Sequence, residues 1–284
     1  MIASPAAVAS YWHNLAACYP ALRWPLRPSS EDIRFMKAEV AKWVAAHSES
    51  EPNVLLLGVT PEIADMQLPA ASSLTAVDSS MAMARAVWPG NIPGKRQVSC
   101  GNWLALPLQE SACGVVIGDG SMNCLPYPDG YLQLAAEVCR VLSTDGIFIL
   151  RCYIQPAVQE RPDDVFADIF REPIPSFHHF KFRILMAMQR SPRVGIAVDE
   201  VYRNWADRNI DTRPLTSRAG WEQSAIDTIE LYRDSATVHT FPTLAEYRSV
   251  LDDFFDEISQ FKVPCNLGER CPILVLKPRH HHNA

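Results

Sequence analysis

The sequence predicts an α/β protein with a Rossmann-like, mostly parallel sheet flanked by helices. Short apolar runs alternate with amphipathic helical patterns along much of the chain. This alternation is typical of parallel strands that are joined by right-handed crossovers. The runs are too short for helices and are therefore interpreted as buried strands; they cover residues 53–58, 74–78, 113–118 and 146–151.

Residues 1–50 are expected to form an N-terminal helical cap. Apolar residues recur every three or four positions between 31 and 46, which is the pattern of an amphipathic helix, and Ser29 or Ser30 suits its N-cap. Further helices are predicted over 80–87 and 129–142, and the Ser-Thr-Asp-Gly turn at 143–146 is expected to end the second of them.

Residues 156–240 interrupt the alternation. They contain several prolines and arginines together with two helical patterns, 176–189 and 198–208. We expect a helical insertion that covers the substrate, within a single domain whose cofactor-binding core comprises 51–155 and 241–278.

The C-terminal part returns to regular elements. A helix is predicted over 243–255, and strands over 256–263 and 271–277. The loop at 264–270 is too short for a crossover helix, so the two strands should form an antiparallel hairpin at the sheet edge.

The composition is that of an ordinary globular protein. The chain has 284 residues, of which 48% are hydrophobic and 20% charged, and a formal net charge of −6. This balance argues against broad electrostatic binding to nucleic acid or to an anionic membrane. No apolar stretch is long enough to cross a bilayer, and the N-terminus does not have the pattern of a signal peptide.

The cysteines and the terminal histidines do not predict a metal site. The eight cysteines are scattered without a Cys-x-x-Cys pair, which is typical of free thiols in a reducing compartment, so we expect a cytoplasmic protein. The run from His280 to His282 is interpreted as a frayed tail.

The first candidate binding loop runs from Gly58 to Glu62, directly after the first strand. Thr60 suits a helix N-cap, Pro61 a first helical turn, and Glu62 the positive end of the helix dipole. Twenty residues past Gly58, Asp78 ends the second strand, a spacing at which a carboxylate can accept both hydroxyls of an adenosine ribose.

The residues of this loop distinguish between two nucleotide cofactors. A pyrophosphate requires glycines and an uncluttered helix N-terminus, whereas this loop has Thr60 and Glu62 in those places. A carboxylate repels phosphate but tolerates an ammonium or a sulfonium, which favours S-adenosylmethionine. Two structural interpretations stay open: Glu62 can simply cap its helix, and Asp78 can cap the next one with Ser79 or Ser80.

Two later loops should reach the same sheet edge. Asn102 can bond an adenine amino group and Trp103 can stack on a ring, or they can be a turn residue and a core residue. In the next loop Asp119 lies between glycines, where the backbone can approach a ligand, although a tight turn with a solvated Asp119 explains the pattern equally well.

Together these segments resemble the class I S-adenosylmethionine-dependent methyltransferases. The resemblance covers about 50–155 and resumes at 243–278, where the hairpin resembles the reversed last strand of that family. The corresponding segments are VLLLG with the loop to Glu62, LTAVD ending at Asp78, CGNW, VVIGDG and EVCRVLSTDGIFILR.

The resemblance implies roles for individual residues. Gly58 and its loop would flank the methionine moiety, Asp78 would hold the ribose, and Asn102 with Trp103 would lie by the adenine. The candidate cofactor-binding residues are Tyr11, Gly58, Val59, Thr60, Glu62, Asp78, Ser79, Met83, Gly101, Asn102, Trp103, Asp119 and Gly120.

The chain also departs from the family pattern. Leu56 stands where an acid is usual, Thr60 and Glu62 replace glycines, and Asn102 replaces a commoner Asp. These changes concern the amino-acid moiety of the cofactor above all, and Glu62 is a candidate for the missing acidic role.

The predicted activity is methyl transfer to a small molecule by in-line displacement. The cofactor supplies the activated methyl group, so no catalytic signature is compulsory. The candidates for a general base are Asp119, Tyr127, His178 and His179, the histidines being equally compatible with an amphipathic helix. The alternatives are a non-catalytic regulatory protein that binds S-adenosylmethionine or S-adenosylhomocysteine, and an NAD-dependent oxidoreductase.

Overall fold

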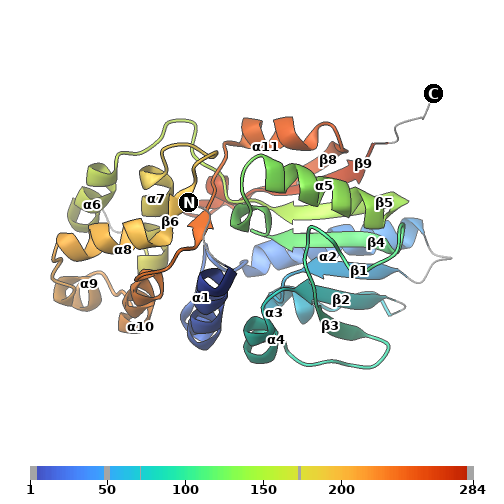
Figure 1. The fold of residues 1–284 in the computed structure, drawn as a ribbon, viewed down its shortest axis with the longest axis horizontal. Coiled ribbons are helices and arrows are strands. Elements are labelled where there is room, and N and C mark those ends of the chain that lie inside the picture. The colour runs from blue at the N-terminus through green and yellow to red at the C-terminus, as the bar shows by residue number, and fades with distance from the viewer. Residues whose placement is uncertain (1–4, 48–51, 71, 172–173, 280–284) are drawn as a thin grey trace.

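A seven-stranded sheet forms the centre of the protein. The computed structural model describes residues 5–47, 52–70, 72–171 and 174–279, and the sheet order is β3-β2-β1-β4-β5-β9-β8. The predicted α/β architecture with a mostly parallel sheet is confirmed (Figure 1). The strands are β1 (Asn53–Leu57), β2 (Ser73–Asp78), β3 (Arg96–Cys100), β4 (Cys113–Asp119), β5 (Leu142–Arg151), β8 (Phe255–Phe261) and β9 (Ile273–Pro278).

The predicted edge hairpin is also confirmed. Strand β9 is antiparallel to both β5 and β8, while the pairings from β3 to β5 are parallel. This arrangement agrees with the reversed last strand that the resemblance to class I methyltransferases implies. The strand order reverses between β1 and β4, and a sheet of this type binds ligands where its order reverses.

Helices cover both faces of the sheet because alternate strand residues point to opposite sides. On one face Met36 and Val40 of α2 (Ser30–Ala46) pack with Leu56 of β1. On the other face α5 (Asp129–Val141) and α11 (Leu244–Leu251) pack against the neighbouring strand residues, for example Leu55 and Phe148. Helix α2 begins at an N-cap formed by Ser29, one of the two predicted caps.

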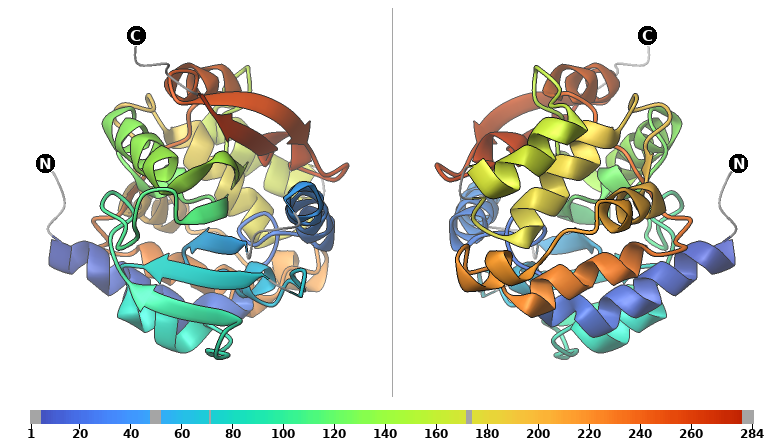
Figure 2. Two further views of the ribbon diagram at one scale, coloured as in Figure 1. Left: turned by 90° about the vertical axis from the view of Figure 1, so that its right-hand side faces the viewer. Right: turned by 90° about the vertical axis from the view of Figure 1, so that its left-hand side faces the viewer.

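A third group of elements lies beyond the strand ends. It comprises the N-terminal helix α1 (Pro5–Cys18) and most of 156–240, which together form their own apolar cluster. Figure 1 shows the helices of this segment gathered at one end of the sheet, and Figure 2 shows α1 beside them. The segment contains α6 (Pro162–Arg171), α7 (Phe177–Met188), β6 (Ile196–Ala197), α8 (Val198–Asp207), α9 (Arg213–Ser217), α10 (Gln223–Asp227), η3 (Thr228–Tyr232) and β7 (Val238–His239).

Several short elements join these layers. They are η1 (Tyr19–Ala21), α3 (Pro61–Ala64), α4 (Met81–Val87), η2 (Met122–Cys124) and η4 (Gly268–Arg270). Helix α4 confirms the prediction over 80–87, with Ser80 as its N-cap. The helical patterns at 176–189 and 198–208 are confirmed as α7 and α8.

Two predicted boundaries were wrong. The turn expected at 143–146 belongs to β5, because Leu142 already pairs with Cys113 and the register then shifts at an irregularity before Ile147. The helix predicted over 243–255 ends at Leu251, because Phe255 enters β8 and pairs with Pro278. The run from His280 to His282 lies outside the described residues.

Among the described residues, no helix combines the length and the hydropathy that spanning a bilayer requires.

Candidate functional site

A cavity lies at the carboxyl ends of β1, β2 and β4, where the strand order reverses. Its empty volume, counted together with the solvent at its open mouth, is about 1020 Å³. Strand ends and loops form its floor, and α1, α7 and β7 contribute the opposite walls. Its apolar lining includes Trp12, Leu15, Leu22, Leu26, Phe182, Leu185 and Phe241.

Gly58 forms the sharp turn that opens the cavity floor. Its backbone N–H donates to the Val77 carbonyl at 2.8 Å, and its φ of +107° is a conformation that residues with side chains rarely adopt. A Cβ placed there would point between Trp103 and Asp78, at 3.7 and 3.9 Å from their nearest atoms. The glycine therefore leaves open the space between the first two strand ends.

Asp78 borders the same space. Its side chain is buried, its Oδ1 accepts from the backbone N–H of Ser80 at 2.7 Å, and its Oδ2 lies 3.9 Å from the position that a Cβ at Gly58 would take. Burial raises the pKa of Asp78 to about 6, although the hydrogen bond from the Ser80 backbone lowers it in part. Asp78 is therefore not the cap of the next helix, which is Ser80, but it bonds the backbone of that cap residue and lies in the cavity wall.

The loop after β3 contributes one residue to the lining. The indole N–H of Trp103 donates to the Val77 carbonyl at 2.6 Å, which fixes the ring beside Gly58. Asn102 is exposed, and its side chain accepts from the backbone N–H of Leu104 in a local turn. Asn102, Gly101 and the exposed Ser79 lie outside the cavity lining.

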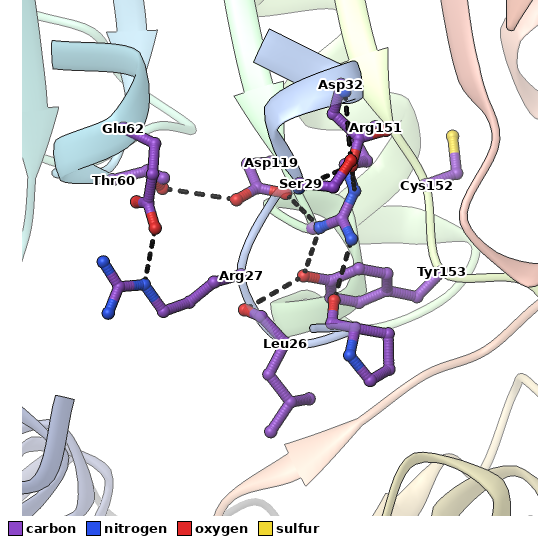
Figure 3. Close-up of polar contacts among 12 residues, drawn as sticks. Leu26, Arg27, Ser29, Asp32, Thr60, Glu62, Asp119, Arg151, Cys152 and Tyr153 are labelled. Carbon is purple, nitrogen blue, oxygen red and sulfur yellow. Dashed lines mark hydrogen bonds and ion pairs between the residues drawn. The ribbon is translucent and has the colours of Figure 1, made fainter. Parts of the chain in front are cut away.

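Thr60 and Asp119 meet across the cavity floor (Figure 3). The Thr60 hydroxyl donates to Asp119 Oδ2 at 3.4 Å instead of capping the short helix α3. The other carboxylate oxygen, Oδ1, accepts from Arg151 at 2.8 Å. Both oxygens of Asp119 are thus engaged, which favours a structural role over proton transfer.

Arg151 is the fully buried centre of this network. Besides Asp119 it contacts Asp32 at the start of α2, with 3.5 Å between Nε and Oδ2, and donates to the carbonyl of Pro25 and the hydroxyl of Tyr153. The guanidinium also lies over the Trp24 ring, 4.8 Å from its centroid. The end of β5 thereby holds the loop between α1 and α2 against the cavity.

Glu62 pairs with Arg27 of that loop. The distance from Arg27 Nε to Glu62 Oε1 is 2.6 Å, and each side chain is about one quarter exposed (Figure 3). Glu62 does not line the cavity. In this structure its charge is directed to the N-terminal loop and not to the space where a cofactor ammonium was expected.

The cavity brings together most of the predicted cofactor residues. The ones in its lining are Tyr11, Gly58, Val59, Thr60, Asp78, Met83, Trp103, Asp119 and Gly120. A Cβ at Gly120 would come within 2.5 Å of the Tyr153 ring, so the close approach expected at this glycine is made by a side chain of the protein.

Three of the four candidate bases lie elsewhere. His178 bonds the Ala21 carbonyl at 2.9 Å, and His179 bonds Ser176 at the N-cap of α7 at 2.8 Å. Burial lowers the pKa of both imidazoles to about 4. Tyr127 is half-buried and reaches the Glu246 carbonyl. All three are absent from the cavity lining, where Asp119 alone represents this group.

Sequence reasoning missed the polar residues of the opposite wall. Lys181, Tyr232 and His239 line the cavity although they come from different elements of the insertion. A signal for Lys181 exists in the pattern FHHFKF, in which a lysine lies within an otherwise buried helical run. Burial lowers the pKa of Lys181 to about 7 and that of His239 to about 4.

The residues present fit an adenosyl group in three respects. Gly58 opens a cradle between two strand ends, Asp78 offers a buried acceptor beside it, and Trp103 offers an aromatic surface. Ser121 also lines the cavity, but its hydroxyl is buried without a hydrogen-bond partner and lies close to Gly118. Within the described ranges no cluster of three or more His, Cys, Asp or Glu side chains could hold a metal ion.

Comparisons with known proteins support the fold alone. No family model and no curated protein matches the sequence. A crystal structure from Rhodobacter sphaeroides, described as a candidate Zn-dependent alcohol dehydrogenase, matches with a TM-score of 0.62 and 11% identity, over 96% of this chain and 98% of that one.

Several other solved structures that match are described as methyltransferases. One from Methanosarcina mazei has a TM-score of 0.47 and 15% identity, covering 84% of this chain and 98% of that one. The 1,6-didemethyltoxoflavin-N1-methyltransferase of Burkholderia thailandensis, solved with S-adenosylhomocysteine, has a TM-score of 0.48 and 12% identity, with 99% and 92% covered. Because both scores lie below 0.5, the fold assignment rests on the first match and on the strand order.

Proposed function

We propose that the protein binds S-adenosylmethionine in this cavity and transfers its methyl group to a small-molecule acceptor. The observation that carries the proposal is the position of Asp78, a buried carboxylate beside the Gly58 turn at the point where the strand order reverses. A carboxylate so placed accepts from both hydroxyls of a ribose, and the glycine leaves room for the rest of the nucleoside.

The surroundings favour a sulfonium nucleoside over a dinucleotide. The first helical turn after β1 carries Glu62, and Thr60 occupies the place of a second glycine, so no glycine-rich cradle for a pyrophosphate exists in this loop. This is the main argument against an NAD-dependent oxidoreductase. The matched Rhodobacter protein is described as an alcohol dehydrogenase, but that similarity concerns the fold alone.

The opposite walls favour a small acceptor. Helices α1 and α7 cover the cavity with apolar side chains, among them Trp12, Leu15, Phe182 and Leu185. An enclosed apolar wall holds a small molecule and excludes water from the reacting atoms, which is the main contribution a protein makes to methyl transfer.

Each residue then has a limited task. S-adenosylmethionine, when bound, would supply an activated methyl carbon on positively charged sulfur, and an acceptor nucleophile attacking that carbon in line would displace the neutral thioether. Asp78 holds the ribose, Trp103 flanks the nucleoside, and the Asp119–Arg151 pair keeps the covering loop in place. Specificity for the acceptor comes from the insertion and α1.

Two measurements test the proposal. Calorimetry should detect one S-adenosylhomocysteine per chain, and a metabolite panel incubated with tritium-labelled S-adenosylmethionine should contain at least one labelled product. Binding without transfer to any acceptor would support the non-catalytic regulatory protein instead. Binding of NAD without binding of S-adenosylhomocysteine would replace the proposal by the oxidoreductase.

A further inference from the structure

Lys181 is a buried lysine of the cavity wall that has no anionic partner among the described residues. Its side chain is 1% exposed, and it comes from the middle of α7. The ion pairs among the described residues do not include it. A buried ammonium is costly unless it is paired, so this arrangement calls for an explanation.

The contacts of Lys181 satisfy it only in part. Its Nζ donates to Thr228 Oγ1 at 2.8 Å, and the Thr228 hydroxyl in turn donates to the Ala225 carbonyl at 2.6 Å. The Nζ also lies over the Tyr232 ring, 5.0 Å from its centroid, and 6.0 Å from that of Phe177. One hydroxyl and two ring faces hold the ammonium in place without neutralising it, and an ammonium has three donors.

Other polar side chains lie around the same part of the cavity. Tyr11 is 6.3 Å from Tyr232 and 6.2 Å from His239 between ring centroids, and all three line the cavity with Lys181. The positive charge of Lys181 contributes to the lowered pKa of His239, after burial itself. We call Tyr11, Lys181, Tyr232 and His239 the lysine cluster.

We propose that the acceptor is a small, largely apolar molecule with one anionic oxygen group, which the lysine cluster binds through an ion pair with Lys181. This inference rests on the proposed function, because only that function makes the bound anion a methyl acceptor. An anion bound in the cavity would complete the hydrogen bonds of the ammonium, and the positive charges of Lys181 and of the cofactor sulfonium would both attract it. Such a pair, closed off from water, is stronger than an exposed one.

Matched acids and amides test the inference. The probes are benzoate, salicylate and cinnamate against benzamide, salicylamide and cinnamide, titrated into the full chain with and without S-adenosylhomocysteine, and binding is followed by calorimetry. For the native protein we expect at least one acid to bind tenfold or more tightly than its amide. For Lys181→Met the acid affinity should fall at least tenfold, and the amide affinity should change little.

Lys42→Met is the matched control, because this lysine is 74% exposed on α2 and should leave both series unchanged. S-adenosylhomocysteine binding by Lys181→Met reports folding and cofactor binding independently of the acid series. If the native protein does not bind S-adenosylhomocysteine, the proposed function is contradicted. The difference in affinity between acids and amides tests the role of Lys181 independently of that result. Amides binding as well as acids, an acid preference that survives Lys181→Met, or no acid binding at about 10 mM would overturn the inference.

Discussion

Arg151 donates to Asp119 across 2.8 Å, and the two residues are direct neighbours in the register of β5 and β4. The pair links the strand ends that form the cavity floor with the N-terminal loop that covers it, since Arg151 also bonds the Pro25 carbonyl. Asp119, which the sequence suggested as a candidate base, is therefore the anchor of a buried cation.

Asp119→Asn should destabilise the fold. The substitution leaves the fully buried guanidinium of Arg151 with Asp32 as its remaining carboxylate, and breaking such a pair typically costs about 3 kcal/mol or more. Guanidinium chloride unfolding measures the difference. Asp256→Asn removes an exposed partner of Arg279 and should cost no more than about 1 kcal/mol. Equal stability of the two variants would contradict the anchoring role.

The affinity for S-adenosylhomocysteine should depend on the charge of Asp78. Its pKa of about 6, raised by burial, means that the carboxylate is lost as pH falls through 6. If ribose binding requires the carboxylate, affinity falls roughly tenfold between pH 7 and pH 5. Calorimetry at both pH values measures this, with Asp78→Asn as a control that binds weakly and shows no such change. A native affinity that is the same at both values would contradict the role of Asp78.

Asp78 should also lower the stability of the ligand-free protein. Because its folded pKa is raised above the usual value of 3.8, the folded state favours the protonated form, and the native protein loses stability as pH rises from about 4 to about 6. Asp78→Asn removes this cost, so the variant should gain on the order of 1–3 kcal/mol at pH 7 and almost nothing at pH 4. Urea unfolding at the two pH values checks the difference, and a variant less stable than the native protein at pH 7 speaks against it.

Gly58→Ala should abolish the binding of S-adenosylhomocysteine, and this loss should be larger than its effect on the stability of the fold explains. The new Cβ occupies the space between Trp103 and Asp78, and the φ of +107° adds strain of about 1–3 kcal/mol. Gly94→Ala is the matched control, because Gly94 also has a positive φ, +69°, but a Cβ there meets nothing within 4 Å. We expect only the control to bind S-adenosylhomocysteine normally. Normal binding by Gly58→Ala would show that the ligand does not lie in this cradle.

Lys181→Met should stabilise the ligand-free protein at neutral and acidic pH. The folded pKa of Lys181, lowered to about 7 by burial, lies below its usual 10.5, so the cost of the buried ammonium is fully present below pH 7. The native protein regains this stability as pH rises from 7 to 10.5. The gain of the variant, on the order of a few kcal/mol at pH 6, should therefore shrink toward pH 10. Thermal unfolding across this range measures it, and a variant destabilised at pH 6 would argue for a purely structural lysine.

The sheet and its cofactor side could be predicted because their signals are local. A glycine at the end of one apolar run and an aspartate at the end of the next determine where Gly58 and Asp78 lie once the strands are parallel. The hairpin followed in the same way from the short loop before Cys271. These inferences need only strand direction and chain connectivity.

The opposite wall of the cavity and the covering loop could not be predicted because their contacts are distant in sequence. Lys181 reaches Thr228, 47 positions away, and Arg27 reaches Glu62 from a different layer. In the sequence His178 and His179 look more reactive than Lys181, yet the rotation of α7 places them against backbone and cap atoms while Lys181 faces the cavity. Nothing in the local pattern determines that rotation.

A crystal structure of the protein with S-adenosylhomocysteine tests the position of the adenosyl site most directly. We expect the ribose hydroxyls to bond the Asp78 carboxylate and the nucleoside to lie in the cavity against Gly58 and the edge of the Trp103 ring. A ligand found elsewhere, or an Asp78 side chain directed away from it, would contradict the assignment of this cavity as the adenosyl site.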